Sequence, residues 1–154
     1  MDWMLLPYQR YAEFSGRSRR REYWMFALLG LLVYAFCGAL MYAGGLGVAL
    51  MASAGGRPDF AAASFGASFW FGLAVAVVFG LASLIPAIAV TIRRLHDRDL
   101  SGWWYLGTIV AGAIPILGTI ASLAFLVVMC LDGTPGPNRF GPDPKSDRGA
   151  STFG

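Results

Sequence analysis

Three long stretches of the chain contain no charged side chain. No Asp, Glu, Lys or Arg occurs at 23–56, 60–92 or 100–131, which are runs of 34, 33 and 32 residues. Each run exceeds the roughly 20 residues that an α-helix needs to cross a bilayer. Backbone amides inside a bilayer must be hydrogen-bonded within their own segment, which favours helices over open sheets. The pattern therefore predicts an all-α, polytopic transmembrane bundle built from three long apolar segments.

The first two spans can be placed within these runs. The first is predicted at about 23–43, with Tyr23 and Trp24 as an aromatic anchor at the headgroup level. Five glycines between Gly44 and Gly56 predict that this helix ends there and gives way to a connector. The second span is predicted at about 68–92.

Small residues recur at every fourth position in both spans. Such a stripe lets a neighbouring helix approach closely, which matters in lipid because no hydrophobic force acts between helices there. We therefore interpret two stripes as packing faces: Ala35, Ala39 and Ala43 in the first span, and Ser68, Gly72, Ala76 and Gly80 in the second.

The third segment, 103–131, begins with the aromatic residues Trp103 and Trp104 and is interrupted by Pro115 and Gly118. It is either one kinked, tilted span or a hairpin that turns near Pro115. Each half of a hairpin would be only about 20 Å long, which is short of a hydrocarbon core of about 30 Å. Length therefore favours the single kinked span.

Composition places a membrane domain between two polar ends. Hydrophobic residues make up 56% of the chain and charged residues 14%, against about 25% charged in soluble domains. We divide the chain into a basic flank at 1–22, a membrane domain at 23–131 and a Gly/Pro-rich polar tail at 132–154. The apolar region at 23–51 is longer than the roughly 7–15 residues of a signal-peptide core, so we predict an uncleaved first span.

The distribution of Lys and Arg predicts the orientation. The N-terminal flank carries five, the first connector one, the second connector three and the tail three. Because positive residues concentrate on the cytoplasmic side, the N-terminus is predicted to be cytoplasmic. A kinked third span puts 8 of these charges inside and 4 outside, whereas a hairpin puts 11 inside and 1 outside. Charge thus favours the hairpin against the length argument, and the side of the tail stays open.

The densest charged segment is 93–99, which contains His96, the only histidine. On a helix, Arg93 and Asp97 stand one turn apart and can pair, while Arg94 can pair with acids of the N-terminal flank. Adjacent arginines disfavour a bound cation, so we expect an ion-paired cap and no metal or cofactor. The sequence also lacks phosphate-loop, serine-hydrolase and zinc-protease motifs and has no Asp, Glu, Lys, Arg or His inside the predicted spans, so neither an enzyme nor a pump is expected.

The charged segments together resemble the bacterial inner-membrane family known as domain of unknown function 805. The resemblance covers about residues 10–144 and rests on four ordered motifs: Phe14–Trp24, Arg93–Arg98 with Ser101–Trp104, Pro115–Gly118, and Gly133–Pro144. Asp99 departs from the pattern, because a small residue, often glycine, is expected there. The resemblance implies a helical inner-membrane protein without an established activity.

The recurring motifs lie at the predicted water–membrane boundaries. We therefore hypothesise one interfacial polar cluster, which requires the tail to return to the cytoplasmic face and hence the hairpin. Its members are Arg17, Arg20, Glu22, Arg93, Arg94, His96, Asp97, Asn138 and Arg139.

Three classes of function are compatible with this organisation. The favoured one is a structural or interaction protein of the cytoplasmic membrane that contacts the bilayer, including anionic phospholipid headgroups, through its basic residues. A homo-oligomer or another membrane protein is a compatible partner, whereas nucleic acid is not expected, because the positive charges lie beside spans. The alternatives are a small oligomeric channel or transport component, and a membrane-surface enzyme that uses His96 and Asp97.

Overall fold

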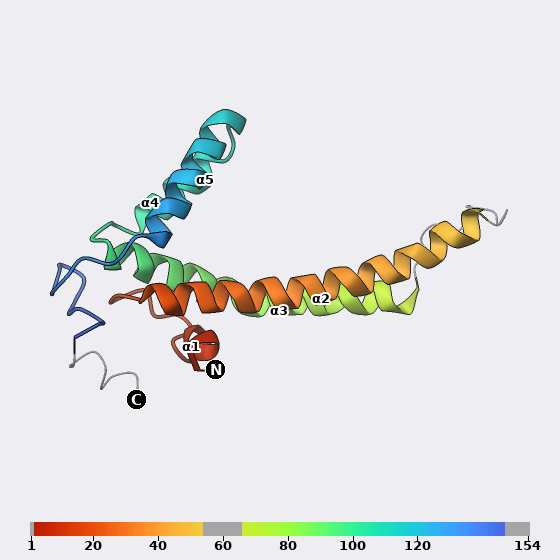
Figure 1. Ribbon diagram of the computed structural model, residues 1–154, viewed down its shortest axis with the longest axis horizontal. Coiled ribbons are helices and arrows are strands. Elements are labelled where there is room, and N and C mark those ends of the chain that lie inside the picture. Colours follow the sequence, from red (N-terminus) through yellow and green to blue (C-terminus); the bar gives the residue numbers. More distant parts are fainter. Residues whose placement is uncertain (1, 54–65, 147–154) are drawn as a thin grey trace. The chain divides into compact units, whose positions relative to one another are not determined.

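The computed structural model describes residues 2–53 and 66–146, and this part of the chain is helical without a β-strand (Figure 1). The helices are α1 (Asp2–Gln9), α2 (Arg20–Ser53), α3 (Ala67–Asp97), α4 (Trp103–Ala111) and α5 (Pro115–Cys130). Helices α2 and α3 are long and apolar enough to cross a membrane, whereas α5 is a shorter apolar helix. The all-α prediction is therefore confirmed for these residues.

The chain divides into two compact units, which are described separately. The apolar unit is Leu28–Leu84, and the charged unit combines the residues up to Ala27 with those from Ile85 onwards.

In the apolar unit, α2 does not end at Gly44 as predicted but continues as a helix to Ser53. The reason is tertiary packing, which offsets the roughly 1 kcal/mol by which each glycine disfavours a helix. Gly44 is buried against the start of α3, and a Cβ atom added there would lie 2.6 Å from the backbone nitrogen of Phe69. The glycine therefore serves as a contact point. The last part of the predicted connector, 54–56, lies outside the described residues.

The two stripes of small residues differ in their outcome. Gly72 and Gly80 face α2, because a Cβ atom at Gly72 would lie 2.9 Å from the Cys37 carbonyl oxygen and one at Gly80 would lie 2.9 Å from the Tyr34 hydroxyl. The alanine stripe at 35, 39 and 43 is instead exposed. The prediction for α2 was wrong because fourfold spacing fits more than one helix face, and only the partner helix selects the face that packs.

The third apolar segment is a hairpin, so the favoured prediction of a single kinked span is wrong. Helices α4 and α5 lie side by side and contact each other (Figure 1). The ring centroids of Tyr105 and Phe125 lie 5.9 Å apart. Ile114 is extended, as expected for a residue before proline. Pro115 then starts α5, where its missing N–H has no cost. A Cβ atom at Gly118 would lie 2.8 Å from the Cα of Gly112, so two glycines allow the turn to close tightly.

The two ends of the charged unit have different structures. The N-terminal flank contains a helix that was not predicted from the sequence pattern, α1, which packs Tyr8 against Phe26 with ring centroids 5.4 Å apart. The tail at 131–146 contains neither helix nor strand and has one isolated β-bridge, between Asn138 and Gly141. Its glycines at 136 and 141 adopt positive φ angles of 73° and 142°. The tail is thus an irregular but hydrogen-bonded segment.

Candidate functional site

Two consecutive arginines near the end of α3 are fully buried and contact different parts of the charged unit. Arg93 donates a hydrogen bond of 2.9 Å from Nη2 to Oε1 of the buried Glu22, near the start of α2. Its Nη1 donates to the carbonyl oxygens of Arg10 and Glu13, in the segment that follows α1. Arg93 therefore connects the end of α3 to the N-terminal flank and to α2.

Arg94 points to α5 and to the carboxylate of Asp97. Its Nη1 donates to Asp97 Oδ2, one turn further along α3, and its remaining nitrogens donate to the carbonyl oxygens of Met129 and Leu131. Helical spacing predicted the opposite pairs, with Arg93 able to bind Asp97 and Arg94 able to bind acids of the flank. That assignment was wrong because the i,i+3 and i,i+4 positions are both within reach of Asp97, and the position of Glu22 decides between them.

Asp97 is the centre of the buried charges. Its Oδ1 accepts a hydrogen bond of 2.9 Å from Nε of Arg17, and its side chain is 4% exposed. Arg17 is also buried and uses its two terminal nitrogens to bind the carbonyl oxygens of Thr134 and Gly136. The backbone N–H of Thr134 in turn donates to the Asp97 carbonyl oxygen at 2.8 Å. One carboxylate thus joins the N-terminal flank, the end of α3 and the tail.

His96 and Asn138 add to the attachment of the tail. The Asn138 side-chain amide donates a hydrogen bond of 2.9 Å to the His96 carbonyl oxygen. The His96 ring stacks on Phe140, with centroids 3.9 Å apart and an angle of 3° between the rings, while its Nδ1 lies 3.2 Å from the Gly16 carbonyl oxygen. The imidazole therefore has structural contacts on a ring face and on one nitrogen.

The remaining two predicted members, Arg20 and Arg139, lie at the exposed edge of the cluster. Arg20 pairs with Asp132 at 3.3 Å, and its side chain is 49% exposed. Arg139 pairs with Asp99 at 3.1 Å, and its side chain is 60% exposed. The structure thus separates the nine predicted residues into a mostly buried network and two solvent-accessible cations.

The buried network has an excess of positive charge, with three arginines facing the two carboxylates of Glu22 and Asp97. Backbone carbonyl oxygens from the flank, α5 and the tail supply the other acceptors. This arrangement suits arginine because its planar group presents five donors in a fixed geometry. Removing one partner from such a network is costly, because it leaves an uncompensated buried charge.

Two residues outside the predicted set contribute to the site. Thr134 joins the tail to Asp97, and Phe140 provides the stacking surface for His96. Both lie within the motif Gly133–Pro144 on which the family resemblance rested, which was the available signal. The motif does not reveal their roles, because these depend on contacts in the folded chain: Thr134 with the Asp97 carbonyl oxygen, and Phe140 with the His96 ring.

The carboxylate of Asp143 helps to hold the tail in its own conformation. The backbone N–H of Lys145 donates to Oδ1 at 2.8 Å and that of Gly136 to Oδ2 at 3.0 Å. These donors, led by Lys145, keep the pKa of Asp143 below its usual range. The side chain therefore stays ionised and keeps its role as an acceptor down to acidic pH.

The site does not have the arrangement expected of a metal centre. Among residues 2–53 and 66–146, no group of three or more His, Cys, Asp or Glu side chains could hold a metal ion. The side chains of the site form a network of buried ion pairs.

Known proteins resemble the chain along almost its full length. The family described as protein of unknown function (DUF805) matches residues 11–142. The inner membrane protein YhaH of Escherichia coli strain K12 is 36% identical over 151 residues, covering 94% of this chain and 98% of the relative. The inner membrane protein YhaI of the same strain is 35% identical over 145 residues, covering 94% and 97%. No solved structure matches significantly. The resemblance inferred from the four motifs is thereby confirmed.

Proposed function

Given that the chain belongs to the DUF805 family of proteins of unknown function, we propose that it is a structural, lipid-contacting protein of the inner membrane. In this proposal the buried ion-pair network holds the helix ends and the tail together, and exposed basic side chains around it contact anionic headgroups. The observation that carries the proposal is that Arg17, Arg93 and Arg94 are buried and already bound to protein acceptors.

The proposed topology has two crossing helices, α2 and α3, and a re-entrant α4–α5 hairpin. At 1.5 Å per residue, α4 is about 14 Å long and α5 about 24 Å, against a hydrocarbon core of about 30 Å. The contacts of Arg17 with Thr134 and Gly136 support a tail on the same side as the N-terminal flank. With 11 of the 12 Lys and Arg residues then on one side, the positive-inside rule supports a cytoplasmic location for both ends.

Reporter fusions test this topology. A reporter active only in the cytoplasm should function at the C-terminus, and one active only in the periplasm should function when inserted beside Arg57. A periplasmic C-terminus would contradict both the re-entrant hairpin and the shared polar cluster.

The lipid contact is assigned to basic side chains that are partly or fully exposed. Each such charge beside an anionic membrane surface contributes about 1 kcal/mol. The network arginines are excluded from this role because Arg17, Arg93 and Arg94 are buried and cannot reach a headgroup. The residues that form this basic rim are Arg20, Arg21, Arg98, Arg139 and Lys145.

Spin-labelled lipids can measure the contribution of the rim. In reconstituted vesicles, wild-type protein should hold phosphatidylglycerol at its surface more strongly than phosphatidylcholine. The Arg21→Gln/Arg139→Gln variant should lower this preference by up to about fivefold per removed charge. The matched Arg21→Lys/Arg139→Lys variant keeps the charge and should keep the preference. Equal selectivity in all three proteins would refute a lipid role for the rim.

We propose no catalytic role for His96 or Asp97. The stacking of His96 on Phe140 and the two arginines on Asp97 support positions that maintain structure. A His96→Gln variant should therefore change any cellular phenotype only as far as it changes the amount of folded protein. A lost phenotype at unchanged protein level would favour the enzyme hypothesis instead.

A further inference from the structure

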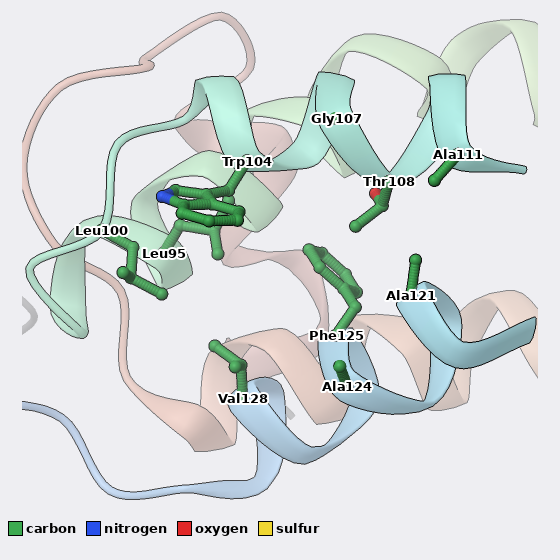
Figure 2. A pocket seen from close by; sticks show the side chains of 10 residues that line it. All are labelled: Leu95, Leu100, Trp104, Gly107, Thr108, Ala111, Ala121, Ala124, Phe125 and Val128. Atoms are coloured by element: carbon green, nitrogen blue, oxygen red, sulfur yellow. The ribbon is translucent and has the colours of Figure 1, made fainter. Parts of the chain in front are cut away.

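An apolar pocket of about 420 Å³ lies within the charged unit, between α4 and α5 and beside the end of α3. Figure 2 shows Trp104, Thr108 and Ala111 of α4 facing Ala121, Phe125 and Val128 of α5 across this space. We refer to it as the α4–α5 pocket. Its wall is formed by Leu95, Leu100, Trp104, Gly107, Thr108, Ala111, Ala121, Ala124, Phe125 and Val128.

Small residues create this pocket. Gly107 and Ala111 stand one turn apart on α4, and Ala121 and Ala124 stand one turn apart on α5, so both helices present a recessed surface to the gap. The bulky Trp104 and Phe125 flank the recess. The two helices therefore meet in a hairpin without filling the space between them.

The chemistry of the wall selects a hydrocarbon occupant. Thr108 carries the only side-chain hydroxyl in the wall, and it donates a hydrogen bond of 2.7 Å to the Tyr105 carbonyl oxygen. A polar ligand would thus find few partners, and water needs two to four polar groups to be held. An empty apolar space would also forfeit the dispersion contacts of its wall. An alkyl chain satisfies both conditions.

Positive charge gathers at the end of the pocket where Leu95 and Leu100 meet the end of α5. Arg94 binds the Met129 and Leu131 carbonyl oxygens, Arg20 binds that of Cys130, and Arg98 binds that of Asp132. Arg94 is buried, but Arg20 and Arg98 extend to the exposed edge. The pocket therefore joins an apolar recess to a rim in which Arg94, Arg20 and Arg98 outnumber the carboxylate of Asp132, which pairs with Arg20.

We propose that the α4–α5 pocket binds one acyl chain of an anionic phospholipid, with its headgroup beside Arg20 and Arg98. This inference deepens the proposed lipid contact and rests on it for the headgroup, whereas the acyl chain is assigned by the pocket wall. The apolar exterior of the hairpin supports access from the bilayer, since Ile109, Val110 and Ile120 are all more than half exposed. The site holds a specific lipid at Arg20 and Arg98, in contrast to the lipids that exchange around the other residues of the rim.

Native mass spectrometry of the full chain, purified in detergent with equimolar phosphatidylglycerol and phosphatidylcholine, tests the proposal. Wild-type protein should retain one phosphatidylglycerol per chain. Ala121→Phe fills the pocket and should lower retention about tenfold, a change of ~1.4 kcal/mol. The control Ala39→Phe adds the same group at an exposed position of α2 and should retain lipid as the wild type does.

A second pair of variants covers the case in which Ala121→Phe fails to fold. A Cβ atom at Gly107 meets no heavy atom within 4 Å, and the same is true at Gly38, which does not line the pocket. Gly107→Leu should lower retention and Gly38→Leu should not. Unchanged retention in folded Gly107→Leu would overturn the acyl-chain site.

The headgroup contact has its own readout. Arg20→Gln/Arg98→Gln should keep one retained lipid but shift it from phosphatidylglycerol towards phosphatidylcholine. A retained lipid without any headgroup preference in the wild type would refute the anionic contact while leaving the pocket supported. The same spectra also report dimers of the chain. If the wild type forms dimers and Ala121→Phe loses them while its lipid retention is unchanged, the acyl-chain site is refuted and the pocket binds a second copy of this chain.

Discussion

Helices α2 and α3 pack through small residues in the apolar unit, whereas the charged unit joins its segments through buried ion pairs. In the apolar unit, Gly44 of α2 lies against Phe69 of α3. Gly72 and Gly80 of α3 lie against Cys37 and Tyr34 of α2. In the charged unit, Arg17, Arg93 and Arg94 bind two carboxylates and carbonyl oxygens of segments far apart in sequence. The first kind of contact depends on shape and the second on charge.

The difference follows from what each environment makes favourable. Lipid tails are as apolar as leucine, so apolar helices gain little by meeting, and close approach through small residues provides the attraction. Irregular segments such as the tail cannot use this device, because they have no regular face to present. An arginine side chain can instead donate hydrogen bonds to several carbonyl oxygens at once, and these bonds specify which segments meet.

The largest effect is expected from removing the carboxylate at the centre of the charged unit. Asp97→Ala leaves Arg17 and Arg94 buried without their shared partner, so it should lower the free energy of unfolding by about 3–5 kcal/mol. Titration with SDS in mixed micelles measures this change. Asp132→Ala is the control, because Asp132 also faces two cations, Arg20 and Lys145, but is exposed and should change stability little. Similar small losses in both variants would show that burial does not set the importance of these pairs.

A smaller loss is expected from filling a contact point in the apolar unit. Gly72→Leu places a side chain against the Cys37 carbonyl oxygen and Leu40, and overpacking of this kind costs about 1–3 kcal/mol. Gly30→Leu is the matched control, since a Cβ atom there meets no heavy atom within 4 Å. It should leave stability unchanged or raise it by about 0.8 kcal/mol through helix propensity. The same titration compares them, and equal effects would mean that Gly72 is not a packing contact.

A gain is expected at the junction between α3 and the loop that follows. Asp99 has a φ of 59°, and the N–H groups of Asp99 and Leu100 donate to the His96 and Leu95 carbonyl oxygens, which forms a Schellman motif. Glycine adopts this conformation without a Cβ penalty, so Asp99→Gly should stabilise the protein by about 0.5 kcal/mol. Measuring it in an Arg139→Ala background removes the contribution of the Asp99–Arg139 pair. A loss of stability there would contradict the interpretation of Asp99 as a strained helix cap.

The smallest effect concerns the tail at low pH. The pKa of Asp143 is lowered in the folded protein, so its stabilising effect is complete above the unfolded pKa and is lost as the pH falls through the folded value. Hydrogen exchange of the backbone amides of Gly136 and Lys145 should therefore speed up below about pH 4 relative to neighbouring amides, after correction for intrinsic rates. Asp143→Asn should abolish this pH dependence. If the dependence persists in the variant, another carboxylate controls the tail.

The candidate site was partly accessible from the sequence, because its residues occur in motifs that flank the apolar runs. The individual partners were not. Arg93 and Arg94 are neighbours of the same type, and nothing local distinguishes the one that binds Glu22 from the one that binds Asp97. Similarly, both an interrupted helix and a hairpin are compatible with Pro115, because proline fixes its own φ angle but not the path of the preceding turn.

The pattern of charges along the chain was enough to predict the helical, membrane-embedded class, because long charge-free runs in lipid must satisfy their own backbone hydrogen bonds, as helices do and open sheets do not. It also determined the family, through short polar motifs in a set order. Three features became visible only in the folded chain: α2 continues past Gly44, α4 and α5 form a hairpin, and Asp97 holds the tail. Each of these depends on contacts between segments distant in sequence, whose free energies outweigh the local preferences that a sequence pattern reports.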